Sequence, residues 1–325
     1  MCIRDSLRGV LVVDNVARGP SIGGVRMAVD VTTEECARLA RAMTFKNAAA
    51  DLQHGGGKSV LVGDPKMPRA QKETLIRGFC SALQEVEQYI FGPDMGTNEE
   101  CMGWVKDEIS RAVGLPRALG GIPLDEIGAT GFGLSHAIDV AQEFCDIDIK
   151  GARIVVQGFG AVGKHAARFL RKQGAILVAV SDTAGTIHDP DGLDVDALID
   201  LKTAGRSVTE HDAGEKLDGD AIIDIECEIW IPAARPDVIH EGNVHRLNAR
   251  MIAQGANIPI TTAAEKILHQ KDILNIPDFI ANAGGVICAA IEYQGAGEAA
   301  AFTAIEEKLR RNTREMLETA NREQI

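Results

Sequence analysis

A glycine-rich turn between an apolar run and a helical pattern constrains the fold of this chain more than any other feature. The segment Gly158–Gly163, with the sequence GFGAVG, follows the apolar run Arg153–Gln157 and opens a helix expected over Gly160–Gln173. Asp182 follows the next expected strand, Ile176–Ser181. Glycines so placed allow a tight turn, close approach of a pyrophosphate and close helix–strand packing. The motif in this context predicts a Rossmann-type dinucleotide-binding domain.

The residues of this turn are candidate dinucleotide contacts, because the N-terminus of the helix that follows faces an anion favourably. The candidates are Gly158, Gly160, Ala161, Val162 and Gly163. The carboxylate of Asp182 can accept hydrogen bonds from a ribose and would repel a 2′-phosphate, which favours NAD, with NADP as the alternative. The competing interpretation is a glycine turn that holds no ligand.

The rest of the second part alternates between strand and helix patterns. Short buried strands are expected at Ala221–Ile223, Ile229–Ile231 and Met251–Ala253, and two helices from Gly285 onward. Alternation of this kind predicts a parallel, doubly wound sheet.

The first third of the chain also reads as an α/β domain. A strand is expected over Arg8–Asp14 and a short one over Val60–Val62. Thr32–Glu35 matches a capping box that opens a helix, and Pro68–Val86 reads as an amphipathic helix with proline at its start. With 325 residues, the length suggests two domains.

Two lysines and an aspartate occupy positions that we interpret as loops. Lys58 directly follows the glycines of Gly55–Gly57, Lys46 lies in the sequence MTFKN, and Asp94 follows Gly–Pro. Glycine lets the backbone bend sharply and a ligand approach closely. Two cations and one carboxylate suit a small zwitterion, because one lysine can pair with its carboxylate while the other groups move protons at its amine. The alternative is that these are solvated surface charges, as most lysines are.

Composition excludes several classes of partner. The formal net charge of −13 argues against broad binding to nucleic acid or to an anionic membrane. The seven cysteines form no CxxC and no Cys/His cluster, which indicates reduced thiols in a cytoplasm and no metal site. No apolar run approaches the roughly 18 residues of a membrane span, and the N-terminus has no signal-peptide pattern. We expect a cytoplasmic protein.

The three charged segments resemble the glutamate/leucine/phenylalanine/valine dehydrogenase family, and the dinucleotide motif agrees. The resemblance implies NAD(P)-dependent, reversible oxidative deamination of an L-amino acid to a 2-oxo acid and ammonia. It makes Lys58 the catalytic lysine and Asp94 the proton shuttle to the amine, while Lys46 holds the substrate α-carboxylate. Three matched segments in the same order outweigh the surface-charge interpretation.

The same resemblance implies further residues on the cofactor side. Thr130 matches the residue that approaches the nicotinamide amide. Strand-end loops around the nicotinamide are matched by Ala233, Ala234, Asn257 and Asn282. For either asparagine taken alone, capping of a loop is an equally good explanation. Ser181–Thr183 is similar to a segment found in both NAD and NADP members.

The segment Gly114–Gly128, which contains several glycines and prolines, is the expected crossing between two domains, and the resemblance implies a homo-oligomer built through the first domain. Residues 1–125 would form the substrate-binding and oligomerisation domain, and residues 126–284 the dinucleotide-binding domain. Residues 285–325 would be C-terminal helices that pack back toward the first domain. The first residues fit no pattern that we can use, so we expect the first domain to be truncated at its N-terminus.

Two positions bear on the substrate side chain. In glutamate-using relatives a lysine precedes the Gly–Gly of the first substrate segment, and a small hydroxyl residue on a later helix assists it. Here those positions are Ile22, before Gly23 and Gly24, and Ala289. Neither side chain can donate to a carboxylate, and burying an unpaired substrate carboxylate is costly. An aliphatic substrate side chain would instead be stabilised by burial there. We expect leucine or valine as substrate, with glutamate as the alternative.

A catalytically silent nucleotide-sensing protein is a second alternative. It would keep the dinucleotide domain, yet it would need none of Lys46, Lys58 and Asp94, so their joint presence argues against it.

Overall fold

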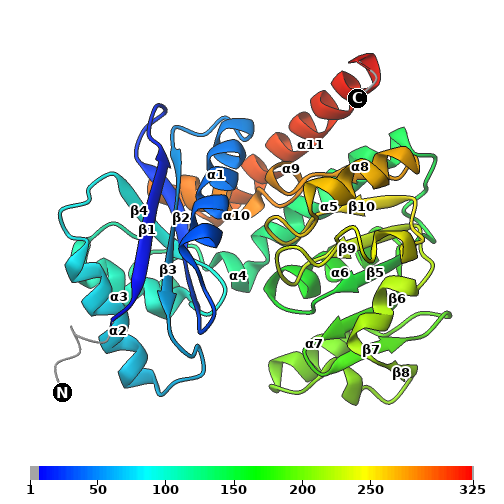
Figure 1. Ribbon diagram of the computed structural model, residues 1–325, viewed down its shortest axis with the longest axis horizontal. Helices are drawn as coiled ribbons and strands as arrows, with labels where there is room; N and C mark the ends of the chain where they lie inside the picture. The colour runs from blue at the N-terminus through cyan, green and yellow to red at the C-terminus, as the bar shows by residue number, and fades with distance from the viewer. Residues whose placement is uncertain (1–6, 324–325) are drawn as a thin grey trace. The chain divides into compact units, whose positions relative to one another are not determined.

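The structure is a computed structural model that describes residues 7–323, and these divide into two compact units (Figure 1). The first unit runs to Ile127 and includes Gly285–Ala304, and the second comprises Gly128–Gly284 and the chain from Ile305 onward. The α/β class predicted from the sequence is confirmed in both. The expected truncation at the N-terminus concerns the start of the chain, and residues 1–6 lie outside the described residues.

The first unit contains a four-stranded sheet with the order β1-β3-β2-β4. Its strands are β1 (Gly9–Asn15), β2 (Ser21–Ala28), β3 (Gly55–Val62) and β4 (Tyr89–Pro93). Strand β1 is antiparallel to β3, whereas β3, β2 and β4 run parallel. Its helices are α1 (Thr33–Ala49), α2 (Arg69–Ala82), α3 (Glu99–Ile109), α4 (Leu124–Ile127) and, after the second unit, α10 (Gly284–Tyr293).

The alternation of side chains along β2 separates the core of this unit from its polar face. Val25 and Met27 pack in one apolar cluster with residues of α2 and α3, such as Phe79 and Met102. The alternate residues of the strand point to the opposite face, which α1 covers (Figure 1). Ile22, Gly24 and Arg26 therefore share the α1 face of the sheet.

The glycines before Lys58 are part of strand β3, so the expectation of a glycine loop is wrong. They are needed because other backbones approach them closely. A Cβ added at Gly55 would lie 1.8 Å from the carbonyl oxygen of Asn15 on β1, and one at Gly56 would lie 2.1 Å from the backbone nitrogen of Thr44 on α1. Glycine here permits tight packing of strand and helix instead of a bend.

The second unit contains a seven-stranded sheet with the order β11-β10-β9-β5-β6-β7-β8. Its strands are β5 (Arg153–Gln157), β6 (Ile176–Asp182), β7 (Gly185–His188), β8 (Glu215–Leu217), β9 (Ile229–Pro232), β10 (Met251–Ala253) and β11 (Leu274–Ile276). The pairs from β11 to β6 are parallel, as predicted, while β7 and β8 extend the sheet antiparallel. The sheet is therefore mixed, and its antiparallel extension was not predicted from the sequence.

Helices cover this sheet and connect its strands. They are α5 (Ala129–Ala141), α6 (Ala161–Lys172), α7 (Val195–Thr203), α8 (Thr262–Gln270), α9 (Asp278–Ala281) and α11 (Glu298–Glu323), whose first turns belong to the first unit. The strand expected at Ala221–Ile223 is wrong: these residues lie in a 3₁₀-helix, Gly219–Asp224. Ile222 and Ile223 are buried all the same, and a short apolar run alone does not distinguish a buried helix from a strand.

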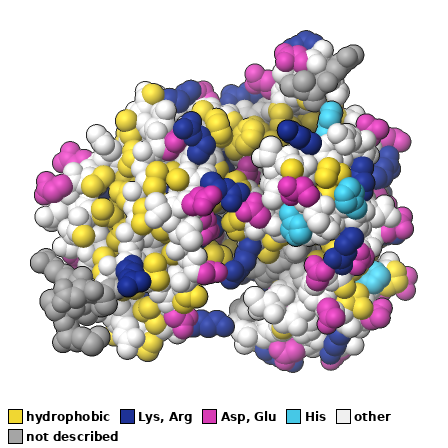
Figure 2. Space-filling view, in the orientation of Figure 1, with side chains coloured by type: hydrophobic (Ala, Val, Ile, Leu, Met, Phe, Trp, Pro, Cys, Tyr) yellow, Lys and Arg dark blue, Asp and Glu magenta, His cyan; other side chains and the backbone are white. Residues whose placement is uncertain are grey.

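The surface seen in Figure 2 carries hydrophobic side chains over the sheet of the first unit. Strand β1 is at the end of that sheet and is only partly buried. Val16, directly after β1, leaves 43% of its surface exposed, and Val29, after β2, leaves 69%. An apolar edge strand of this kind is a surface on which another chain can pair. Among the described helices, none has both the length and the apolar character of a bilayer span.

Candidate functional site

The charged residues singled out in the sequence lie on one face of the first unit. Lys58 is in β3, and Asp94 follows the end of β4. Strand β2, between these two strands, contributes Arg26 to the same face. The shared alternation of three parallel strands brings together residues that are far apart in the sequence.

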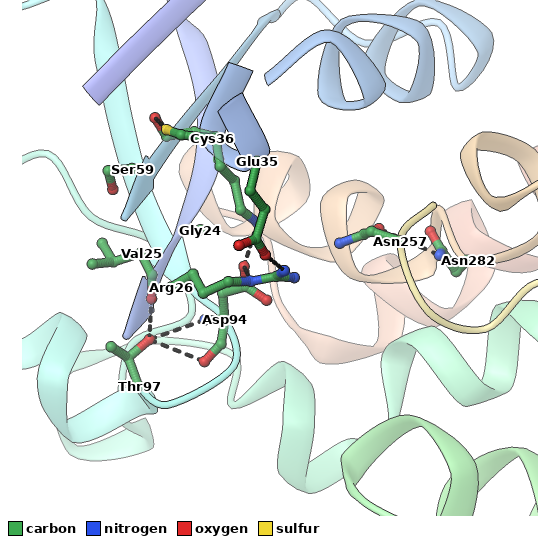
Figure 3. Close-up of polar contacts among 12 residues, drawn as sticks. Gly24, Val25, Arg26, Glu35, Cys36, Ser59, Asp94, Thr97, Asn257 and Asn282 are labelled. Carbon is green, nitrogen blue, oxygen red and sulfur yellow. Dashed lines mark hydrogen bonds and ion pairs between the residues drawn. The ribbon is translucent and has the colours of Figure 1, made fainter. Parts of the chain in front are cut away.

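Asp94 is the acceptor at the centre of this group. Its Oδ2 atom pairs with the ammonium of Lys58 and with Nε of Arg26, the latter at 3.3 Å. The Nη1 atom of Arg26 reaches Glu35 of α1 at 2.5 Å, so Arg26 lies between two carboxylates (Figure 3). The side chains of Lys58 and Arg26 are 3% and 5% exposed, so the group is largely removed from water.

The position of Asp94 is fixed by the turn that it opens. The hydroxyl of Thr97 accepts the backbone N–H of Asp94 at 3.0 Å and lies 2.8 Å from the carbonyl of Val25, to which it donates (Figure 3). Gly24 is required for the close approach, because a Cβ there would lie 2.6 Å from the Cβ of Asp94. The carboxylate is thereby held against β2.

The pKa directions in this group follow from its two cations and shared carboxylate. Burial favours the neutral form of Asp94, but Lys58 and Arg26 outweigh it and hold the pKa of Asp94 below its usual range. Burial also lowers the pKa of Lys58, and the nearby Arg26 adds to this against the opposing effect of Asp94. Arg26 keeps its proton because its pKa is raised, despite burial, by Asp94 and Glu35. Lys58 is thus easier to deprotonate than an exposed lysine.

Lys46 lies in helix α1, so its expected loop position is wrong. It is 3% exposed and sits among the residues of α1 that are buried at helical spacing. Its neighbour Asn47 anchors the helix, because Nδ2 donates to the carbonyl of Gly55 on β3 at 2.6 Å. Lys46 is therefore held at a helix position beside the strand that carries Lys58.

The residues expected to select the substrate side chain are buried in the first unit. Ile22 of β2 is 2% exposed and lies opposite Gly56 of β3 and Ile90 of β4. Ala289 of α10 is 6% exposed. Gly23 faces away from Ile22, and its carbonyl accepts the hydroxyl of Tyr89 at 2.8 Å. Alternation along β2 places Ile22 on the same face as Gly24 and Arg26.

The glycine turn of the second unit combines close packing with open space. Gly158 has φ +93°, and a Cβ there would lie 2.9 Å from the backbone of Ala233 and of Ala234. A Cβ on Gly163 would lie 2.0 Å from the carbonyl of Gly158, which accounts for the third glycine. A Cβ on Gly160, the N-cap of α6, would meet nothing within 4 Å. The turn is close-packed on the protein side and open at the helix N-terminus.

Asp182, expected at the ribose, is engaged by protein groups. Its Oδ1 accepts from Ala184 N at 2.9 Å and from Ser207 Oγ at 2.9 Å. Its Oδ2 accepts from Lys202 Nζ at 2.7 Å and from Val208 N at 3.0 Å. Each oxygen thus has two donors, as many as a carboxylate oxygen ordinarily accepts. Contact with a ribose stays a prediction.

The remaining cofactor candidates lie at the starts and ends of helices. Thr130 is in the first turn of α5, which follows Gly128 with φ +77°. Asn257 and Asn282 lie side by side (Figure 3), with Asn282 Nδ2 3.4 Å from Asn257 Oδ1. Asn282 is 4% exposed, and its Oδ1 has no hydrogen-bond partner within residues 7–323. An orphaned buried oxygen of this kind is an acceptor that a ligand can satisfy.

Sequence reasoning missed the role of Arg26. The residue stands in the quoted segment Gly23–Met27, but its partners Glu35 and Asp94 lie on other elements. A usable signal was present: Arg26 is the only charged residue in the otherwise apolar or small stretch Ser21–Ala28. A charge in such a strand is buried only when it is paired.

Comparison with known proteins agrees with this geometry. The family model described as "Glutamate/Leucine/Phenylalanine/Valine dehydrogenase" matches residues 120–324, and that of the "Glu/Leu/Phe/Val dehydrogenase, dimerisation domain" matches residues 4–111. The chain therefore belongs to the Glu/Leu/Phe/Val dehydrogenase family of amino acid dehydrogenases, as its sequence motifs predicted.

Individual relatives carry the name glutamate dehydrogenase. That of Aeropyrum pernix is 40% identical over 293 residues, covering 86% of this chain and 70% of the relative. The NAD-specific glutamate dehydrogenase of Staphylococcus aureus is 36% identical over an alignment that covers 94% of this chain and 76% of the relative. The crystal structure of hetero-hexameric glutamate dehydrogenase from Thermus thermophilus, in a Leu-bound form, aligns with a TM-score of 0.90 at 28% identity. The alignment covers 97% of this chain and 79% of that one.

Proposed function

We propose that this chain catalyses the NAD-dependent, reversible oxidative deamination of an L-amino acid. The observation that carries the proposal is the buried group of Lys58, Asp94 and Arg26, in which burial and the neighbouring Arg26 lower the pKa of the lysine. Such a group suits a reaction in which water must be activated beside an amine.

The chemistry assigns a role to each residue. A dinucleotide, when bound, supplies the acceptor for the hydride that leaves Cα, and the substrate becomes an imine. Neutral Lys58 takes a proton from the water that adds to the imine carbon. Asp94 transfers protons to and from the departing amine, and ammonia leaves. Lys46 pairs with the α-carboxylate, which fixes Cα for the transfer.

The second unit fits a dinucleotide on two structural grounds. The open N-terminus of α6 at Gly160 leaves room for an anion against backbone N–H groups. The unpartnered Oδ1 of Asn282 provides a buried acceptor beside Asn257. Ala233 and Ala234 flank the same glycine turn. NAD is preferred to NADP because the similar glutamate dehydrogenases of Staphylococcus aureus and Bacillus subtilis are named NAD-specific.

For the substrate, two candidates rest on different observations. Glutamate is favoured by the names of the relatives, which reflect similarity over most of the chain. An aliphatic amino acid is favoured by Ile22, a buried apolar residue on the same face as Arg26 and Lys58. Side-chain specificity depends on a few pocket contacts, so whole-chain similarity and one residue can disagree.

A substrate panel tests the proposal. The purified chain is assayed with L-glutamate, L-leucine and L-valine, following NADH and NADPH separately. Turnover of any of these with NAD supports the proposal, and the ratios of kcat/KM decide between the two candidates. Tight binding of NADH without turnover of any of these would instead support the nucleotide-sensing alternative.

We further propose a homo-oligomer formed through the first unit, in a cytoplasmic location. The match to a dimerisation domain over residues 4–111 and the apolar edge around β1 support the first point. Free thiols at each of the described cysteines suit a reducing compartment. Light scattering at micromolar concentration tests the assembly, and a mass equal to one chain would contradict it.

A further inference from the structure

Ile258 has a backbone conformation that a residue of its type rarely adopts. Its φ is +45°, in the left-handed region, where a β-branched side chain is a genuine outlier. Pro259 follows it, and a proline favours extended backbone in the residue before it. Such a conformation persists only where the surroundings hold it, and these positions cluster at functional sites.

The backbone of Ile258 is held by the carboxylate of Asp278. The N–H of Ile258 donates to Asp278 Oδ2 at 2.8 Å, and the other oxygen accepts the N–H of Phe279 at 2.7 Å. The backbone N–H of Asp278 in turn donates to the side chain of Gln254 at 3.2 Å. Asp278 is 6% exposed, so this acidic side chain is fixed in a largely dry position by backbone groups.

Asn282 holds the other end of the same loop. It lies four residues after Asp278, at the C-terminal end of α9, so both side chains can reach one side of that helix. Its Nδ2 donates to the carbonyls of Gly255 at 3.2 Å and of Ala256 at 2.9 Å. Asn257 stands between these two anchored ends.

We propose that Asp278 is a positioning residue for the dinucleotide, which acts by holding Ile258 in its left-handed conformation and so fixing Asn257. The inference rests on the proposed function and on the position beside the nicotinamide that the family resemblance implies for Asn257 and Asn282. Without the Asp278 carboxylate, Ile258 relaxes toward the extended backbone that its side chain and Pro259 favour. Asn257, its immediate neighbour, then leaves its place. Asp278 itself touches no ligand.

The test is a rescue by glycine, which adopts positive φ without strain. The dissociation constant for NADH is measured by fluorescence for Asp278→Ala alone and combined with Ile258→Gly or with Ile258→Val. Asp278→Ala should weaken NADH binding about tenfold, the loss expected when one positioned side chain no longer makes its hydrogen bond. Ile258→Gly in that background should recover most of the loss. Ile258→Val keeps the β-branched strain and should recover none.

Two further measurements separate positioning from general destabilisation. Asp194→Ala removes a carboxylate at the N-cap of α7, which accepts from the backbone N–H groups of Asp196 and Ala197, and should leave NADH binding unchanged. The KM for the amino acid should stay within about twofold in Asp278→Ala, because the residues proposed to bind it lie on the first unit. If Asp278→Ala does not fold, Asp278→Asn is compared with and without Ile258→Gly.

A folded Asp278→Ala with NADH affinity and turnover equal to wild type overturns the inference and leaves the proposed function intact. Loss of affinity that Ile258→Gly and Ile258→Val restore equally, or not at all, also overturns it. Wild-type chain that neither binds NADH nor turns over an amino acid overturns the proposed function and this inference together.

Discussion

Lys58 and Asp94 form an ion pair across strand β2, and their side chains are only 3% and 15% exposed. Lys58 comes from β3 and Asp94 from the end of β4, and the strand between them supplies Arg26. The arrangement places two cations on one carboxylate in a site with little water. Its chemical consequence is that Lys58 is easier to deprotonate than an exposed lysine.

Lys58→Ala should abolish most turnover while leaving dinucleotide binding unchanged. The reason is that its proposed role, taking a proton from water, is exerted in the transition state and not in the ground state. We expect kcat to fall by about 10²-fold or more, the usual range for a proton-transfer residue, with NADH affinity within error of wild type. Steady-state kinetics measures kcat, and fluorescence titration measures the NADH dissociation constant.

The matched control is Lys66→Ala, because Lys66 is an exposed lysine of the same unit. It should retain wild-type kcat. Near wild-type turnover in Lys58→Ala would contradict the catalytic role given to that residue.

Arg26→Gln should move the pH profile of kcat/KM to higher pH. Arg26 helps to lower the pKa of Lys58, and removing a neighbouring positive charge raises it again. Lys58 acts in its neutral form, so activity rises with pH as the lysine loses its proton. A higher pKa for Lys58 shifts that rising limb upward, which a pH series of initial rates measures.

For this pH series, Arg41→Gln is the control. Arg41 is on α1 but its side chain is 61% exposed and pairs with Asp14. Its loss should leave the rising limb in place. A rising limb that moves to lower pH in Arg26→Gln would mean that Arg26 acts by positioning Asp94 and not through its charge on Lys58.

How much the sequence predicted depends on how local each signal is. The dinucleotide turn could be found because its strand, glycines and helix are contiguous, and β5 (Arg153–Gln157) and β10 (Met251–Ala253) lie where the apolar runs predicted. Motif matching also identified Lys58 and Asp94, which the strands bring into contact. Their structural setting was misjudged, since Gly55–Gly57 read as a loop from composition alone.

What could not be predicted depends on contacts between distant segments. Glycine in β3 is required by the approach of Asn15 and Thr44, and nothing in the local pattern reveals those neighbours. The strain at Ile258 depends on Asp278 in the same way. Strand β2 was missed because Gly23 and Gly24 are unfavourable in strands unless close packing requires them.

Asp182→Ala should destabilise the second unit. The side chain is 8% exposed and accepts from Lys202, Ser207, Val208 and Ala184, which ties β6 to the segment that follows α7. Hydrogen bonds to a charged group contribute about 1.5–3 kcal/mol each, and part of this is regained when the freed groups bind water. We expect a net loss of about 2 kcal/mol in the free energy of unfolding, measured by chemical denaturation.

The pH dependence of this contribution has a definite sign. Burial opposes the charge on Asp182, but Lys202 and the backbone donors outweigh it and lower its pKa in the folded state. Stability from this group is therefore present above the unfolded pKa of about 4 and lost as the pH falls below it. The difference between wild type and Asp182→Ala should shrink on acidification. A difference that is constant between neutral and acidic pH would contradict the ionic nature of these contacts.

Ile22→Lys should change the choice of substrate. Ile22 is buried on the same face of the sheet as Arg26 and beside Gly56, so an ammonium there would meet a substrate side chain if this residue lines its pocket. A buried carboxylate without a partner is costly, and a partner supplied by the protein removes that cost. The ratio of kcat/KM for L-glutamate to that for L-leucine should rise by about tenfold or more, which corresponds to about 1.4 kcal/mol or more. Val29→Lys adds the same charge at a position that is 69% exposed and should leave the ratio unchanged. An unchanged ratio in a folded Ile22→Lys would mean that Ile22 belongs to the core, and that another group meets the substrate side chain.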